Sequence, residues 1–321
     1  MVVIPVLSAS PVTPPQSISR ALLFAQSSMQ ALSGLLVQSD LTALTYPTSL
    51  TRGIVPKDVH SHNDYWRQVP LFDALSYGCK SFEADIHLVD LGNNSTEILV
   101  GHKTVSLSHA RTLKSLYLDP LEAVLDLQNP SNALAVNESS SIDNGVYDYD
   151  PSQSVQFLLD YKTSGPDLHD AVISYLSHFR ERNLLSYYDS TTKTFTERPI
   201  TVVCTGNCPV DLVKQQQPRF IFYDTPLLEV ENADYGSEVA PLASGSLRRL
   251  FGRIGSLDLS GDKLVELRRL VDIAHAKGIK TRFWETPSWP VFKRDATWKT
   301  LIDNGVDWIN ADDLKAATTR F

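Results

Sequence analysis

From residue 54 onward the chain alternates short apolar segments with segments of helical periodicity, and this alternation constrains the fold more than any other feature. It predicts parallel strands, because each crossover between parallel strands needs a connection long enough to hold a helix. Eight such strand candidates indicate a (β/α)8 barrel, an α/β fold. They are residues 54–59, 81–88, 155–161, 199–204, 219–223, 253–259, 280–284 and 306–310.

Helical segments separate most of these candidates, with start and stop signals at their ends. The expected helices are residues 70–77, a segment opening at Asp119-Pro120, and residues 167–182, 260–277 and 295–304. A short run at residues 97–101 is expected to be an excursion or a hairpin partner of the second strand. Polar segments at 129–154, 185–198 and 225–252 are expected to be loops or insertions.

The rival fold is a doubly wound open sheet, which would place a glycine-rich phosphate loop after its first strand. The sequence "HSHNDYW" stands at that place instead. We therefore favour the barrel, with residues 54–321 forming it. Residues 1–53 are rich in Ser, Thr, Pro, Gln and Leu and hold no acidic residue before Asp40, so we expect an N-terminal arm that is flexible or loosely docked.

Composition excludes several classes of protein. The formal net charge of -8 argues against nucleic-acid binding, which requires a basic surface. No run of 18 apolar residues occurs, so no transmembrane segment is expected in this chain, and we expect a monomer. The three cysteines cannot all pair within the chain, and Cys204 and Cys208 form either a small disulfide loop or two free thiols. Sequons beginning at Asn93, Asn94 and Asn137 permit a secretory location.

Ionisable and amide side chains gather near the ends of the first three strand candidates and of the short run at residues 97–101. Catalytic groups of such barrels lie at the carboxyl ends of the strands, and residues two apart in a strand point to the same side. We therefore expect one cluster at the barrel mouth. Its members are His60, His62, Asn63, Glu83, Asp85, His102, Asp160 and Lys162.

This set of residue types indicates metal-dependent chemistry on phosphate. Carboxylates around one point stay ionised together only when a cation lies among them. Oxygen ligands from Asn63, Glu83, Asp85 and Asp160 suit one divalent cation, Mg²⁺ or Ca²⁺, better than zinc. Histidines beside that cation supply a general base and a general acid, and Lys162 is placed to hold a phosphate oxygen.

Several segments, in order, resemble one superfamily of phosphodiesterases. "SHNDY", "GCKSFEADIHL" and "LVGHK" look like the X-half of phosphoinositide-specific phospholipases C, "LLDYKTSG" is similar to a strand of sphingomyelinase D, and "RFWETPSWP" with "LIDNGVDWINADDL" resembles the end of glycerophosphodiester phosphodiesterases. The complete pattern most resembles the fungal "altered inheritance of mitochondria protein 6" group, whose members are phospholipase-C-like barrels. The resemblance runs from about residue 55 to residue 321.

The resemblance implies roles for individual residues. His62 matches the first catalytic histidine and His102 the second, while Asn63, Glu83, Asp85 and Asp160 match metal ligands. Alignment to a His-x-x-Asn pattern would make His60 the catalytic residue instead, and this choice stays open. The implied substrate is a phospholipid or a glycerophosphodiester-like molecule, and a mitochondrial or membrane-associated location is compatible with the group.

Departures from these families leave the substrate undefined. The His-Arg-Gly opening of glycerophosphodiesterases and the cysteine-bridged loop that follows the second histidine of sphingomyelinase D are absent. We expect attack by a neighbouring hydroxyl of the substrate, with a cyclic phosphate as first product, because the site offers no side-chain nucleophile. Two alternatives remain: a zinc amidohydrolase-like barrel, and a barrel without activity that acts as a binding protein.

Overall fold

The computed structural model describes residues 48–93, 95–130, 144–252 and 259–321. The chain divides into two compact units, Met1–Ser49 and Leu50–Phe321, and every element described below belongs to the second unit. The helices covered by the described residues include none that is both long and apolar enough to cross a membrane.

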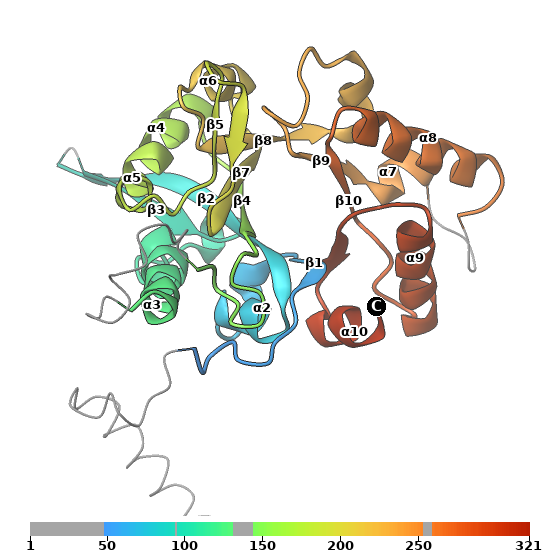
Figure 1. Ribbon diagram of the computed structural model, residues 1–321, viewed down its shortest axis with the longest axis horizontal. Helices are drawn as coiled ribbons and strands as arrows, with labels where there is room; N and C mark the ends of the chain where they lie inside the picture. Colours follow the sequence, from blue (N-terminus) through green and yellow to red (C-terminus); the bar gives the residue numbers. More distant parts are fainter. Residues whose placement is uncertain (1–47, 94, 131–143, 253–258) are drawn as a thin grey trace, which may run out of the picture. The chain divides into compact units, whose positions relative to one another are not determined.

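Within the described ranges, eight parallel strands form a nearly closed barrel (Figure 1). Their order around the barrel is β10-β9-β8-β7-β4-β2-β1-β11, and a parallel bridge between Arg282 and Trp308 links the two ends. This confirms the expected (β/α)8 fold. The strands are β1 (Lys57–Ser61), β2 (Cys79–Gly92), β4 (Val155–Tyr161), β7 (Ile200–Gly206), β8 (Ile221–Pro226), β9 (Leu242–Ser246), β10 (Lys280–Trp284) and β11 (Ile309–Ala311).

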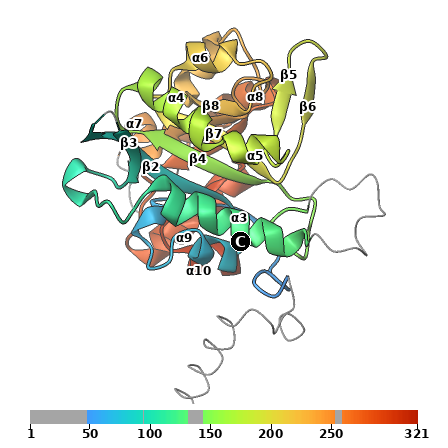
Figure 2. The same cartoon turned by 90° about the vertical axis from the view of Figure 1, so that its left-hand side faces the viewer.

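Helices surround the strands because each buries one apolar stripe against the barrel (Figures 1 and 2). In α3, for example, Leu121, Val124 and Leu125 are buried at helical spacing. The helices are α2 (Phe72–Ser76), α3 (Asp119–Gln128), α4 (Gly165–Tyr175), α5 (Ser177–Glu181), α6 (Val210–Gln215), α7 (Leu247–Phe251), α8 (Asp262–Ala276), α9 (Val291–Asp303) and α10 (Leu314–Arg320). Shorter turns are η2 (Asp64–Trp66), η3 (Thr104–Ser106), η4 (Lys114–Leu118) and η5 (Leu227–Asn232).

The interior of the barrel is layered, because inward-facing side chains recur at every second residue of each strand. The layer nearer the amino ends is an apolar cluster of Leu158, Val203, Phe222, Leu242 and Trp308. Two residues further along β4, β8 and β11, the inward positions are polar. They are Asp160, Asp224 and Asn310. A layer of packed apolar side chains therefore fills the barrel beneath the polar residues at its carboxyl end.

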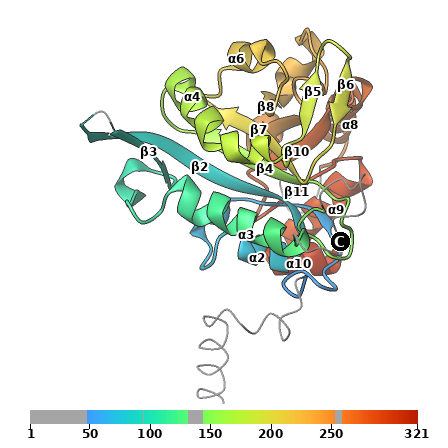
Figure 3. The ribbon, with the colours of Figure 1, turned by 60° about the vertical axis from the view of Figure 1, so that its left-hand side comes forward.

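Two hairpins depart from the barrel pattern. β3 (Ser95–Val100) pairs antiparallel with the outer half of β2, which confirms the hairpin alternative for residues 97–101, and this hairpin extends beyond the strands of the barrel (Figure 3). β5 (Tyr187–Asp189) and β6 (Thr194–Thr196) form the second hairpin, within the segment expected to be a loop or insertion.

The number of barrel strands was predicted correctly, but the sixth strand along the chain lies before the predicted range 253–259. Residues 253–258 of the predicted strand lie outside the described residues, and Leu259 is not in a strand. The barrel strand of this unit is β9, within the segment 225–252 that was expected to be a loop. Its sequence, "LASGS", lacks the β-branched residues that mark strands, so its conformation depends on the pairing with β8 and β10.

Candidate active site

A cavity of about 700 Å³ lies at the carboxyl ends of the strands. It is bordered on one side by the mouth ends of β2 and β4 and on the other by residues of β8, β9 and β10. Of the eight residues predicted for the cluster, seven line this cavity, and His60 does not. The prediction that these strands bring ionisable groups to one mouth therefore agrees with the geometry for all but His60.

Three carboxylates meet at the wall formed by β2 and β4. Glu83, Asp85 and Asp160 each offer an oxygen, and these atoms all lie within 4.8 Å of one another. They meet because Asp85 and Asp160 are register partners in adjacent parallel strands. Within the described residues Asp85 Oδ1 is buried with no hydrogen-bond partner. An all-oxygen set with a spare buried acceptor fits a hard divalent cation.

The Lys162 ammonium group contacts two of these carboxylates. Its Nζ lies 2.5 Å from Asp160 Oδ2 and 3.1 Å from Asp85 Oδ2. Burial, together with the Asp85 and Glu83 carboxylates, raises the pKa of Asp160 to about 6, even though Lys162 opposes the shift. One lysine therefore does not balance three neighbouring carboxylates, and a cation added to the cluster would favour their ionised forms.

His60 belongs to the wall beneath the cavity. β1 extends to Ser61, two residues beyond the predicted strand, so His60 is a fully buried strand residue. Burial and the nearby Arg282 lower its pKa to about 4, so the ring is neutral at pH 7. The ring then donates from Nε2 to Glu83 Oε2 at 3.1 Å and accepts at Nδ1 from the Ser81 hydroxyl at 2.7 Å. His60 therefore contacts Glu83 from beneath the cavity and does not line the cavity itself.

His62 and Asn63 follow β1 directly and line the cavity. Asn63 adopts a left-handed backbone conformation (φ 49°), which residues with short polar side chains tolerate best. His62 Nδ1 lies 2.9 Å from Asp312 Oδ1. Burial lowers the pKa of His62, but the Asp312 hydrogen bond and the Glu83 charge outweigh burial, so the pKa is raised. Asp312 was absent from the predicted cluster, because it lies 250 residues further along the chain.

His102 lies beside Asp85 at the rim of the cavity. Its Nδ1 is 3.0 Å from Asp85 Oδ2 and 3.3 Å from the Tyr65 hydroxyl. That hydroxyl lies 2.8 Å from both Asp85 Oδ2 and Asn63 Oδ1, so Tyr65 links a histidine, a carboxylate and an amide. Tyr65 was absent from the predicted cluster. Its position directly after the His-Asn-Asp run was the only signal for it.

A buried arginine occupies the opposite wall. The guanidinium of Arg282 donates to Ser244 at 2.9 Å, to Asn310 at 3.1 Å and, at a long 3.4 Å, to Asp224. Burial raises the pKa of Asp224, an effect that Arg282 partly offsets. Arg282 and Asp224 were absent from the predicted cluster, since neither belongs to a motif of neighbouring ionisable residues.

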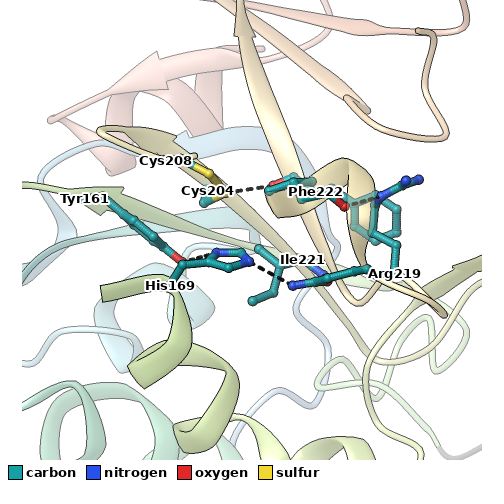
Figure 4. Close-up of a disulfide and its surroundings, with 9 residues drawn as sticks. Tyr161, His169, Cys204, Cys208, Arg219, Ile221 and Phe222 are labelled. Atoms are coloured by element: carbon teal, nitrogen blue, oxygen red, sulfur yellow. Dashed lines mark hydrogen bonds between the residues drawn. A yellow bond between two sulfur atoms is a disulfide. The ribbon is translucent and has the colours of Figure 1, made fainter. Parts of the chain in front are cut away.

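The cysteines at the end of β7 are joined by a disulfide, which resolves the open alternative for Cys204 and Cys208 (Figure 4). The bridge encloses Thr205 and Gly206, both of which line the cavity. Gly206 has φ +67°, and a Cβ atom there would lie 2.2 Å from Asp160 Oδ1. Only glycine therefore permits this approach of β7 to the carboxylate cluster.

Comparison with known proteins gives a consistent result. An AIM6-like phosphodiesterase domain model matches residues 48–224. An altered inheritance of mitochondria protein 6 homolog from Arthroderma benhamiae is 37% identical over 302 residues, covering 91% of this chain and 93% of that protein. The altered inheritance of mitochondria protein 6 of Eremothecium gossypii is 36% identical over 285 residues, covering 84% and 71%.

Among solved structures, a glycerophosphodiester phosphodiesterase from Thermotoga maritima is 13% identical, with a TM-score of 0.41, over 84% of this chain and 98% of that one. The domain match spans more than half of the chain, and the two fungal relatives are similar over most of its length. The chain therefore belongs to the AIM6-like phosphodiesterase family.

Proposed function

We propose that the protein is a metal-dependent phosphodiesterase that cleaves a phospholipid or a glycerophosphodiester-like substrate by histidine acid-base catalysis, through a cyclic phosphate. The observation that carries this proposal is the arrangement of Glu83, Asp85 and Asp160 within 4.8 Å of one another, in a cavity that His62, His102 and Lys162 also line. Phosphoryl transfer requires charge neutralisation and two proton transfers, and this set of groups supplies both.

The charge of the cavity supports one divalent cation. Five carboxylates and three fixed cations line it in the described part of the chain, which leaves a net charge of -2 when the histidines are neutral. Glu83, Asp85, Asp160 and the side-chain oxygen of Asn63 would hold the ion. When bound, the ion would supply positive charge to the non-bridging oxygens of the diester.

The two histidines differ in a way that suits opposite roles. The Nδ1–H of His62 donates to Asp312, which leaves Nε2 to accept the proton of the attacking substrate hydroxyl. His102 has Nδ1 directed to Asp85 and Tyr65. In the imidazolium form its Nε2–H would protonate the departing oxygen and leave the ring neutral. A bond forms between the hydroxyl oxygen and phosphorus while the bond to the leaving oxygen breaks, giving a cyclic phosphate and an alcohol.

The side chains around the cavity support an attacker supplied by the substrate. Among the described residues lining the cavity, no serine or cysteine is hydrogen-bonded to a histidine. Ser61 is fully buried and donates to Asp64. Burial raises the pKa of the Cys79 thiol to about 12, and the other two cysteines are in the disulfide. A covalent enzyme intermediate would need an activated nucleophile.

The alternative of a zinc amidohydrolase gains no support. It would need further histidine ligands at the mouth, but His169, His178 and His275 lie on α4, α5 and α8. His169 is a buried histidine whose ring contacts the Tyr161 hydroxyl and the Gln216 amide. The carboxylate cluster is also a poor match to the nitrogen and sulfur ligands that zinc prefers.

The test is turnover of a panel of phosphodiesters, with and without EDTA, followed by phosphorus NMR. Each substrate is paired with an analogue that lacks the neighbouring hydroxyl. We expect turnover that EDTA abolishes, a cyclic phosphate at early times, and no reaction of the analogue. Equal turnover of both members of a pair with no cyclic species would contradict the cyclic route, and activity that survives EDTA would contradict the metal.

A further inference from the structure

Large apolar side chains are exposed on the turns, loops and first helical turns that follow the barrel strands. Trp66 is 64% exposed after β1, Leu228 is 61% exposed after β8, and Trp289 and Phe292 are 78% and 62% exposed after β10. Val105, on η3 after the β2–β3 hairpin, is 91% exposed. The strands of the barrel are parallel, so the segments after β1, β8 and β10 lie at its carboxyl end. Val105 is three residues after His102, which lines the cavity at the same end.

Exposure of this kind is costly in water. Of the five tryptophans, Trp66 and Trp289 are the exposed ones, and both lie on mouth loops. Tryptophan is large and amphipathic, and it is enriched where one end of a ring is in an apolar phase and the other in water. Exposed aromatic residues at a functional mouth therefore indicate a surface that is buried in use.

The exposed residues continue into the cavity. The Trp66 ring lies edge-on to the His102 ring, with centroids 5.7 Å apart, and Leu228 is both exposed and part of the cavity lining. Behind Leu228 the lining includes Leu227, Leu250 and Trp284. An apolar chain lying against this wall would pass from the rim to the carboxylate cluster without crossing open water.

The charged residues around the cavity opening indicate which lipid headgroups this face would contact. Exposed lysine and arginine at Lys103, Arg248 and Arg249 are matched by exposed carboxylates at Glu229, Glu285 and Asp312. A rim of mixed sign on a chain of net charge -8 gains little from an anionic membrane. It is compatible with headgroups that carry both a phosphate and an ammonium group.

We propose that the barrel mouth docks on the surface of a bilayer of zwitterionic phospholipid, with Trp66, Val105, Leu228, Trp289 and Phe292 inserted at the lipid–water interface. The proposal rests on the proposed function only in that the docked face is the mouth of the same cavity. Separate side chains around an opening can each insert into a fluid lipid interface. A protein partner would instead need a surface of complementary shape.

The test uses the full-length protein and large vesicles of phosphatidylcholine, in EDTA so that no turnover is involved. The double variant Trp289→Ala, Phe292→Ala removes two inserted rings and leaves the residues assigned to the site untouched. Its matched control is Tyr149→Ala, Ile302→Ala, where Tyr149 precedes β4 and Ile302 lies at the end of α9, both at the opposite end of the barrel.

We expect the partition coefficient of the double variant to fall about tenfold or more, since two aromatic rings no longer leave water when the protein docks. The control should stay within about twofold of wild type. Tryptophan emission of the wild type should shift to shorter wavelength with vesicles present. Absence of vesicle binding by the wild type, or an equal loss in both double variants, would overturn the proposal.

A second measurement separates this proposal from the proposed function. Turnover of a soluble short-chain diester by Trp289→Ala, Phe292→Ala should equal that of wild type, while turnover of the same headgroup in vesicles should fall. If no diester is cleaved at all, vesicle binding still tests the docking surface. If instead the wild type self-associates in light scattering and the double variant does not, the loops form a protein–protein contact and the proposal is wrong.

Discussion

The two sides of the barrel mouth differ in what they offer a substrate. On the side of β1, β2 and β4, carboxylates and histidines are joined by short hydrogen bonds, such as the chain from Ser81 through His60 to Glu83. On the side of β8, β9 and β10, the cavity is lined by apolar residues such as Leu227, Leu250 and Trp284, together with polar groups that surround the buried cation Arg282. Under the proposed function, the first side would perform the chemistry and the second would orient the substrate.

The largest effect is expected from the carboxylate cluster. Glu83→Gln or Asp85→Asn removes a ligand charge, so both should abolish metal-dependent turnover and metal binding measured by calorimetry. Asp90→Asn is the control, because Asp90 is an exposed carboxylate on the same strand, at the hairpin end of β2. If Glu83→Gln bound the metal with unchanged affinity, Glu83 would not be a metal ligand, and the proposal that this side of the mouth performs the chemistry would be contradicted.

The second prediction separates His60, in β1, from His62, which follows this strand. His62→Gln should reduce turnover on the order of 10²–10⁴-fold, the usual range for a general base, and leave thermal stability unchanged. His60→Gln should lower the free energy of unfolding by roughly 1–3 kcal/mol, since it leaves Glu83 and Ser81 without their buried partner. If His60→Gln lost turnover without losing stability, and His62→Gln lost stability but kept turnover, His60 would be the catalytic histidine.

Arg282→Lys tests the other side. It keeps the positive charge but loses the planar fork that reaches Ser244, Asn310 and Asp224. We expect KM to rise about tenfold, equivalent to about 1.4 kcal/mol, and kcat to stay within about twofold. A fall in kcat with KM unchanged would show that this wall also takes part in the chemical step.

A smaller effect is expected from the disulfide at the end of β7. Replacing both Cys204 and Cys208 by Ala frees the loop that places Gly206 against Asp160. Metal affinity should fall by no more than about tenfold, the lower end of the range for groups that support metal ligands. Dithiothreitol should weaken metal binding by the wild type to the same extent and leave the double variant unchanged; a response of the variant would point to another target.

The smallest effect is expected for Asp313, at the start of α10, and it concerns only the stability of the fold. Asp313 accepts from the Ala316 N–H and pairs with Arg294. Partial burial opposes ionisation, but these contacts outweigh it and hold the pKa of Asp313 below its usual value. Asp313→Ala should therefore cost about 1 kcal/mol above pH 5, and the difference should vanish as pH falls below about 4. Urea unfolding at several pH values would measure it, and a difference that persists at pH 2 would contradict the assignment.

The sequence by itself determined the barrel and most of one side of its mouth. Alternation of strands and helices is a pattern that can be read locally in the sequence. Glu83 and Asp85 are two residues apart, as are Asp160 and Lys162, so the side chains of each pair are expected to point to the same side of a strand. Parallel topology then brings the ends of β2 and β4 together. The apolar alternation of Phe82, Ala84 and Ile86 with Glu83 and Asp85 gave the inward direction, and these three residues are buried in the core.

Tertiary structure alone decided the rest, because the relevant partners are distant in the chain or carry no local signal. β9 is a strand through pairing on both edges, not through its residues. The partners Asp312 of His62 and Asp224 of Arg282 are 250 and 58 residues away. His60 and His62 differ by two positions and look alike in sequence. The structure distinguishes them because β1 ends at Ser61. His60 is therefore a buried strand residue beneath the cavity, and His62 lies beyond the strand and lines the cavity.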